Sequence, residues 1–235
     1  MWNGKKKAIT FSFDDGTLQD VRLINILNKY SLKGTFNICS ALLGTPNTVR
    51  KYGKPIEHSK VSPEDVRSIY DGHEVAVHTL THPWLNKLDD DEVVREIEED
   101  RVRLSELCGY EVTGMAYPFG IYDDRILSLM RERTGIRYSR TIKNTHAFEL
   151  PRADELLTWH PSVYYIEPEF ESVVDEFLAL ECDEPKLLYI WGHSFELDSD
   201  IGDATFDRIC KKLAGREDIF YATNKDLCPE YTKQL

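Results

Sequence analysis

The chain has 235 residues, 41% of them hydrophobic, and a formal net charge of −12 at pH 7. This length favours one large core over two small ones, so we expect a single domain over residues 1–235. The negative charge disfavours binding to nucleic acid or anionic lipid, and no apolar run approaches the roughly 20 residues of a membrane span.

The amino-terminal segment is short and basic and leads directly into an apolar run. It has neither the apolar core nor the small-residue cleavage site of a secretory signal, so a cytoplasmic location is expected. The five cysteines are odd in number, widely spaced and without a Cys-x-x-Cys pair, which argues against a disulfide framework or a structural zinc site.

Short apolar runs alternate with longer amphipathic stretches, an order typical of parallel β/α units. Helices are expected over residues 18–31, 62–71, 89–108, 123–133, 168–180 and 203–213, and the acidic run at 96–100 is expected to be a solvated helix face. Strands are expected over Lys7–Phe13, Gly34–Cys39, His73–Val77, Gly114–Tyr117, Arg137–Ser139, Leu187–Trp191 and Ile219–Tyr221.

About seven strands and six helices indicate an incomplete or distorted β/α barrel. A doubly wound open sheet is the alternative. However, neither a Gly-x-Gly-x-x-Gly segment nor a Walker loop follows any predicted strand, so nucleotide binding is poorly supported.

The first predicted strand ends in two adjacent carboxylates, Asp14 and Asp15, followed by Gly16. Such a sequence alone is most often a solvated turn. At the end of a buried strand, however, two carboxylates stay ionised only if a cation or strong donors stabilise them. Because α/β proteins place ligand groups at the carboxyl ends of their strands, we expect a functional site here, with a metal as the simplest cation.

The third predicted strand is followed by two imidazoles four residues apart, His78 and His82. This spacing is common by chance, but its position puts both rings at the same end of the sheet as the carboxylates. Pro83 disfavours a helical conformation at His82, so the pair is expected on a single turn instead of a long helix. Thr79 stands where a zinc protease of the His-Glu-x-x-His type has glutamate, which argues against that activity.

Four segments together resemble the polysaccharide deacetylases, carbohydrate esterase family four with its NodB homology domain. Ser12–Gly16 resembles the first motif of that family, His78–His82 the second, Met115–Gly120 the third, and Trp191–His193 the fifth. Their order and spacing agree from about residue 6 to 195. The resemblance implies an α/β fold, a distorted (β/α)7 barrel.

The resemblance also implies a role for each residue of the first two motifs. Asp14 would be the catalytic base, and Asp15, His78 and His82 would bind a divalent metal, usually Zn²⁺, with Co²⁺, Ni²⁺ or Mn²⁺ as other candidates. Three protein ligands leave a position open, where a metal can activate water and polarise a carbonyl. A free carboxylate next to a ligand can then take the proton of that water.

Residues of the later motifs are candidates for the remaining steps. His193 would be the general acid that protonates the leaving amine, although a structural histidine in a turn is the alternative. The backbone N–H of Phe119 would stabilise the oxyanion. Four further residues, which are aromatic or lie near strand ends, are candidates for substrate contact: Tyr117, Pro118, Trp159 and Trp191. For Trp159 a place in the core is the default expectation.

The sequence departs from the family in its third motif. Ala116 stands where the family has an arginine that orients the catalytic aspartate. Arg152 is the candidate that we consider for its replacement. The fourth motif is not recognisable.

These observations favour metal-dependent removal of an N- or O-linked acetyl group from a carbohydrate, and the acidic composition suits a neutral acetylated sugar. One alternative is a catalytically weak or inactive carbohydrate-binding relative, motivated by Ala116. Another is a hydrolase of a cyclic amide, which the complete ligand set Asp15, His78 and His82 argues against. A ferrous oxygenase shares such ligands but not the β/α pattern. The oligomeric state is not predicted.

Overall fold

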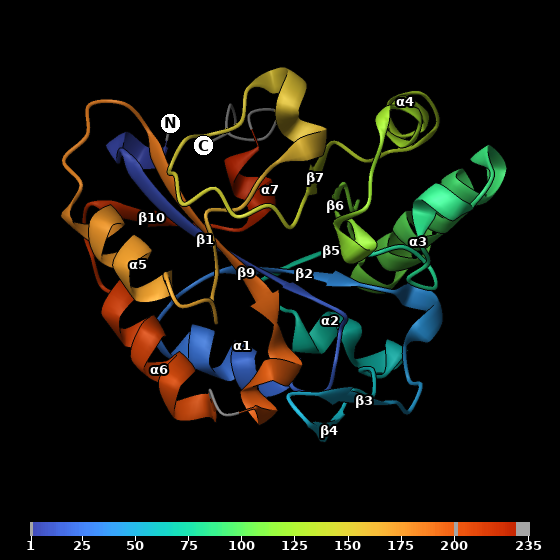
Figure 1. Ribbon diagram of the computed structural model, residues 1–235, viewed down its shortest axis with the longest axis horizontal. Coiled ribbons are helices and arrows are strands. Elements are labelled where there is room, and N and C mark those ends of the chain that lie inside the picture. Colours follow the sequence, from blue (N-terminus) through green and yellow to red (C-terminus); the bar gives the residue numbers. More distant parts are fainter. Residues whose placement is uncertain (1, 200–201, 229–235) are drawn as a thin grey trace.

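The computed structural model describes residues 2–199 and 202–228 (Figure 1). In this part of the chain, eight strands form a parallel sheet in the order β7-β6-β5-β2-β1-β9-β8, with β10 also paired to β1. These strands are β1 (Lys7–Asp14), β2 (Gly34–Ile38), β5 (Glu74–Val77), β6 (Gly114–Ala116), β7 (Tyr138–Arg140), β8 (Val163–Tyr164), β9 (Lys186–His193) and β10 (Ile219–Tyr221).

Helices follow most of the strands and lie around the curled sheet (Figure 1). They are α1 (Asp20–Lys29), α2 (Val66–Ile69), α3 (Asp90–Cys108), α4 (Asp124–Arg133), α5 (Phe170–Ala179), α6 (Gly202–Leu213) and α7 (Asn224–Leu227). None of the described helices is long and apolar enough to cross a membrane. No disulfide joins the five cysteines, all of which lie within the described residues.

The fold class expected from the sequence is confirmed: an α/β fold with a curled parallel sheet. All seven predicted strands form, with ends within two residues of those expected. Two features were not predicted. One is the two-residue strand β8, and the other is an antiparallel hairpin of β3 (Thr48–Lys51) and β4 (Lys54–Glu57). The hairpin strands are short, exposed at half of their positions and rich in charge, so they lack the apolar alternation that identifies a strand.

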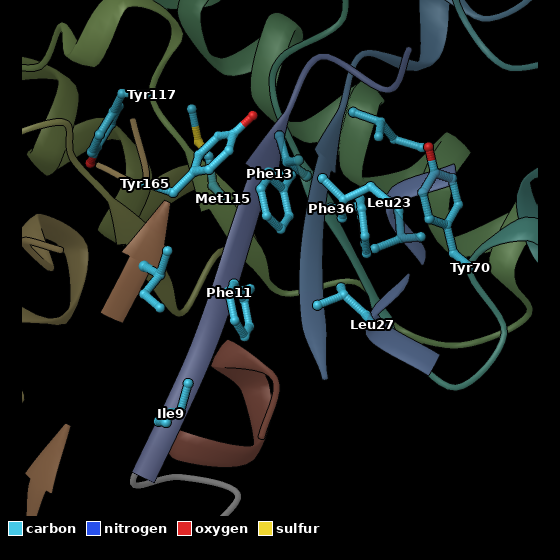
Figure 2. Close-up of a cluster of buried hydrophobic side chains, with 14 of the residues drawn as sticks. Ile9, Phe11, Phe13, Leu23, Leu27, Phe36, Tyr70, Met115, Tyr117 and Tyr165 are labelled. Carbon is cyan, nitrogen blue, oxygen red and sulfur yellow. The ribbon is translucent and has the colours of Figure 1, made fainter. Parts of the chain in front are cut away.

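β1 is the centre of the sheet because it pairs with β2, β9 and β10. Its side chains alternate between two faces, as expected for a strand. Ile9, Phe11 and Phe13 lie on one side of β1 within the apolar core (Figure 2). The rings of Phe11 and Phe13 lie 6.3 and 5.8 Å from that of Phe206 in α6. These apolar contacts fix β1 against the outer helices.

The opposite face of β1 carries polar residues that are buried inside the curled sheet. Thr10 Oγ1 donates to Asn224 Oδ1 at 3.0 Å, and Ser12 Oγ accepts from Asn37 Nδ2 at 2.9 Å and from Arg140 Nε at 3.2 Å. Since buried polar groups are costly unless paired, this network favours one arrangement of the strands. It ends at Asp14, where β1 reaches the rim.

The sheet is not closed by a direct pairing of β7 with β8. Residues 159–164 cross the gap instead, since Trp159 N–H donates to Ser139 O at 2.9 Å and Ser162 N–H donates to Tyr189 O at 2.8 Å. The result is a distorted barrel whose strands all point their carboxyl ends to one rim.

The long helix α3 begins and ends as its sequence predicts. Asp89 and Glu92 form a capping box at its start, and Gly109 ends it with a left-handed φ of 76°. Our expectation of a solvated face at 96–100 was wrong for two residues, because Glu96 and Asp100 are buried. Both face the loop that follows β5, where they accept hydrogen bonds from its backbone.

Candidate functional site

A cavity of about 570 Å³ opens at the carboxyl ends of β1, β5, β6 and β9. Most of the residues singled out in the sequence meet there, as parallel strands require. Pro118 is buried at the start of a short turn, Pro118–Gly120, and is outside the cavity lining. The predicted residues that line the cavity are Asp14, Asp15, His78, His82, Tyr117, Phe119, Trp191 and His193.

Asp14 is buried at the end of β1 and bonded to a guanidinium group. Both of its carboxylate oxygens accept hydrogen bonds from Arg140 Nη2 at 2.5 Å, and Oδ1 also accepts from Asn37 Nδ2 at 2.9 Å. Burial would raise the pKa of Asp14, but the charge and hydrogen bonds of Arg140, together with the neighbouring histidines, hold this pKa below its ordinary value. Asp14 is therefore ionised at neutral pH.

The expectation that Arg152 bonds to this aspartate was wrong. Its guanidinium is largely exposed and pairs with Asp154 and Glu155, its own sequence neighbours. Arg140 takes the place instead. It ends β7, and it is the register partner of Ala116 on β6, so the guanidinium lies one strand away from the position where the family carries it.

Asp15 directly follows β1 with a left-handed φ of 85°, which turns its side chain to the cavity. Its Oδ1 lies 3.8 Å from both His82 Nε2 and Lys60 Nζ, and its Oδ2 lies 3.1 Å from His58 Nε2. Burial opposes ionisation of Asp15, but the hydrogen bond from His58 and the charge of Lys60 keep its pKa well below the ordinary value.

The two imidazoles lie on the loop after β5, with ring centroids 4.8 Å apart. The single turn that we expected over residues 78–82 does not form. The segment is a bent loop, because Thr79 and His82 have left-handed φ values of 66° and 59°. Asp100 accepts from the backbone N–H of His78 at 3.2 Å, and Glu96 accepts from that of Thr81 at 2.9 Å. The buried acids of α3 therefore fix this loop.

The donor atoms of Asp15, His78 and His82 all lie within 4.8 Å of one another, which makes these residues a possible metal site. His78 Nδ1 donates to Ala116 O at 2.8 Å, so its Nε2 is left as a lone-pair donor. Burial lowers the pKa of His78, and burial together with His78 lowers that of His82 to about 4. Two neutral imidazoles and one ionised carboxylate fit a divalent cation.

His193 ends β9 and is the register partner of Asp14 on β1. Its Nδ1 lies 3.4 Å from Oε1 of the buried Glu196. The same carboxylate accepts from Lys51 Nζ at 2.9 Å and from the hydroxyl groups of Tyr52 and Tyr164. Burial alone would lower the pKa of His193, but Glu196 raises it above the ordinary value.

Aromatic side chains form the cavity walls. The exposed ring of Phe119 stacks on Trp84 at a centroid distance of 4.5 Å and meets His82 edge-on at the same distance. Trp191 stacks on Tyr164 at 4.6 Å. Trp159 is not part of the wall, because it is buried among core residues and lies in contact distance of Tyr138 and Tyr189, the default that we expected for it.

Sequence reasoning missed four residues of the site: Arg140, Glu196, His58 and Lys60. Arg140 could have been predicted from the sequence, because it directly follows the predicted strand Arg137–Ser139 and strand ends carry ligand groups. Glu196 lies three residues after His193, but a charged residue in a loop gives no such signal. His58 and Lys60 lie after the unpredicted hairpin, so no pattern connected them to the site.

The chain matches known proteins over much of its length. The sequence profile of the family described as "Polysaccharide deacetylase" matches residues 2–139, more than half of the chain. The peptidoglycan-N-acetylglucosamine deacetylase PgdA of Listeria monocytogenes is 26% identical over 123 residues, which are 51% of this chain and 23% of that protein. The peptidoglycan-N-acetylmuramic acid deacetylase PdaC of Bacillus subtilis is 27% identical over 128 residues, 54% and 24% of the two chains. The chain thus spans about a quarter of the length of these curated relatives.

Two solved structures support the fold. The peptidoglycan deacetylase PdaC of Bacillus subtilis has a TM-score of 0.58 at 18% identity, covering 98% of this chain and 93% of the other. A family 4 carbohydrate esterase from Streptomyces lividans, in complex with acetate, has a TM-score of 0.59 at 18% identity, with coverage of 93% and 92%. At this identity the likeness concerns the arrangement of the strands and helices.

Proposed function

The chain belongs to the polysaccharide deacetylase family, and on this basis we propose that it is a metal-dependent hydrolase that removes N- or O-linked acetyl groups from a carbohydrate. One observation carries the proposal. An ionised, arginine-bound Asp14 adjoins the ligand group Asp15, His78 and His82 in one cavity. This combination of a base and a cation site is suited to the hydrolysis of an acyl group.

In this proposal Asp15, His78 and His82 hold a divalent cation, most readily Zn²⁺. When bound, such a cation supplies a positive charge that acidifies a water molecule and polarises the acetyl carbonyl. Asp14 accepts the proton of the attacking water, and Arg140 keeps the carboxylate ionised and fixed in orientation. Arg140 thus takes the role that the family assigns to the third-motif arginine.

His193 then donates a proton to the departing nitrogen or oxygen of the sugar. Because Glu196 raises its pKa, His193 is protonated over a wider pH range than an unpaired imidazole. The backbone N–H of Phe119 stabilises the negative charge that develops on the acetyl oxygen. Tyr117 and Trp191 contribute to the walls that enclose the acetyl group.

The alternative of an inactive carbohydrate-binding relative rested on Ala116. Arg140 bonds to Asp14 in place of the third-motif arginine that Ala116 replaces, so the presence of Ala116 no longer favours inactivity. The alternative of a cyclic amide hydrolase, expected to lack the complete ligand group, is not favoured by any feature of the site.

The proposal is tested by measuring acetate release from acetylated amino-sugar oligomers and acetylated xylan fragments. The protein is assayed after loading with Zn²⁺ or Co²⁺, after chelation, and as the variant Asp14→Asn. We expect release that requires the metal and falls by at least about 100-fold in Asp14→Asn, since general-base catalysis contributes 10²–10⁴-fold. Asp154→Asn, which changes an exposed acid far along the chain, is the matched control and should release acetate at the normal rate.

Because Asp14 is buried against Arg140, the folding of Asp14→Asn is checked by circular dichroism and by Zn²⁺ binding. A folded variant that binds Zn²⁺ but releases no acetate assigns the base. Zn²⁺ binding by the unaltered protein without release from any acetylated sugar would refute the proposed activity and favour the binding protein.

A further inference from the structure

The segment that leads out of the β3–β4 hairpin runs alongside the loop that carries Asp15. Val61 N–H donates to Gly16 O at 3.0 Å, and Leu18 N–H donates to Ser59 O at the same distance. A side-chain bond adds to them, from Gln19 Nε2 to Glu57 O at 2.8 Å. Two segments about forty residues apart are thus held in a fixed register, with residues 58 and 60 facing the cavity.

His58 is bonded through both of its ring nitrogens. Its Nε2 lies 3.1 Å from Asp15 Oδ2, and its Nδ1 lies 3.2 Å from Asn47 Nδ2. Asn47 Oδ1 accepts from the backbone N–H of Thr48 at 2.8 Å, which leaves its amide NH₂ to donate to the imidazole. Nδ1 is therefore the acceptor, and Nε2–H donates to the carboxylate. The ring is buried and meets Phe195 edge-on at a centroid distance of 4.9 Å.

His58 does not belong to the cation-binding group itself. Among the described residues that group comprises Asp15, His78 and His82, whose donor atoms lie within 4.8 Å of one another. The two carboxylate oxygens of Asp15 face different neighbours: Oδ1 faces His82 and Lys60, and Oδ2 faces His58. A protonated Nε2 has no lone pair for a metal, but it can fix the carboxylate that does.

From this arrangement we infer that His58 is a positioning residue for the cation site, with Asn47 setting its tautomer. Its N–H holds Asp15 Oδ2 so that Oδ1 is directed to the space between the carboxylate and the two imidazoles. The inference rests on the metal site of the proposed function and adds to it a residue outside the family motifs. Asp15 follows the strand in a left-handed conformation, and among the described residues the hydrogen bond from His58 is the shortest polar contact of its side chain.

The test is the affinity for Zn²⁺, measured by competition with a chromophoric chelator, in the full chain and in His58→Leu and His58→Gln. Loss of a hydrogen-bond partner of a ligand typically costs on the order of 10- to 100-fold in metal affinity, and we expect that loss in His58→Leu. Glutamine carries an amide N–H near the position of Nε2, so His58→Gln should retain most of the affinity.

His160→Leu and His160→Gln form the matched control pair. His160 Nδ1 bonds Thr141 Oγ1 at 2.6 Å beside a different cavity, so neither change should alter Zn²⁺ affinity. A further variant, Asn47→Leu, alters an exposed side chain and frees the tautomer of His58, and it should weaken binding less than His58→Leu does. Circular dichroism in the presence of chelator shows whether His58→Leu folds. If it does not fold, the Zn²⁺ affinity of Asn47→Leu tests the inference in its place.

The outcomes separate this inference from the proposed function. Absence of Zn²⁺ binding by the unaltered protein would refute the metal site as a whole. Normal binding by a folded His58→Leu, or equal losses in the Leu and Gln variants, would refute the positioning role and leave the metal site standing. A loss as large as that of His78→Ala would make His58 a ligand in its own right, which also overturns the inference.

Discussion

Replacing Glu196 by glutamine removes the negative charge beside His193 while keeping the size of the side chain. In the protein the carboxylate lies 3.4 Å from His193 Nδ1 and is fully buried. Two unit charges at that distance interact by about 5 kcal/mol at an effective dielectric constant of about 20. Lys51 shares the carboxylate at 2.9 Å and offsets part of this attraction, so a net effect of about 1.5–3 kcal/mol is expected.

The sign of the effect follows from the acid role proposed for His193. The protonated ring is the active form, so the rate falls as the pH rises through its pKa. Glu196 raises this pKa. In Glu196→Gln, burial lowers it and only the weaker charges of Asp15 and Asp14 oppose that effect. At high pH the variant should be about 10- to 100-fold slower, because about 1.4 kcal/mol corresponds to a factor of ten in rate. At low pH, where His193 is protonated in both proteins, the two rates should converge.

The same pair contributes to stability with the matching sign. Because the pKa of His193 is raised in the folded protein, its contribution is fully present below the ordinary histidine value of 6.5 and is lost as the pH rises through the folded value. Urea unfolding at several pH values should therefore show a smaller difference between the protein and Glu196→Gln at high pH than at low pH.

The assays are the pH profile of kcat/KM for acetate release and the NMR titration of the His193 ring, the second of which does not depend on activity. Glu149→Gln is the control, since Glu149 is exposed and pairs with Lys186 far from the cavity. If neither the alkaline limb of the kcat/KM profile nor the NMR titration of the His193 ring shifts in Glu196→Gln, the carboxylate does not control the pKa of His193.

Three further changes test the structure itself. Arg140→Met leaves Asp14 buried without its guanidinium partner and should lower the free energy of unfolding, measured in urea, by about 3–5 kcal/mol. The double variant Arg140→Met with Asp14→Asn should recover part of this lost stability. A loss below 1 kcal/mol would mean that the pair is more hydrated than its burial indicates. Gly192→Ala would place a Cβ 2.2 Å from a ring carbon of Tyr165. It should lower the free energy of unfolding, measured by thermal unfolding, by at least about 1–3 kcal/mol, and an unchanged melting temperature would contradict this close packing. Asp89→Ala removes the cap of α3 and should cost about 0.5–2 kcal/mol in the same assay, and a neutral result would mean that the capping bonds are replaced by water.

The sequence by itself determined the order of strands and helices and the core of the site. Strands such as Lys7–Phe13 can be predicted because their consecutive buried positions are apolar or β-forming. Helix α3 can be predicted because its apolar residues recur at helical spacing. Asp14 with Asp15, and His78 with His82, are readable because each pair is local in sequence and directly follows a strand. Parallel strands of one sheet must then bring the two pairs to one rim.

Tertiary structure alone decided which residues complete the site. Arg140, not Arg152, reaches Asp14, because the register of β6 with β7 sets it beside Ala116, across 126 residues of sequence. His58 meets Asp15 because the hairpin segment pairs with the loop after β1. The direction of a side chain at such long separations depends on register and on loop packing. These are fixed by the sum of many contacts in the folded protein, and no local pattern in the sequence records them.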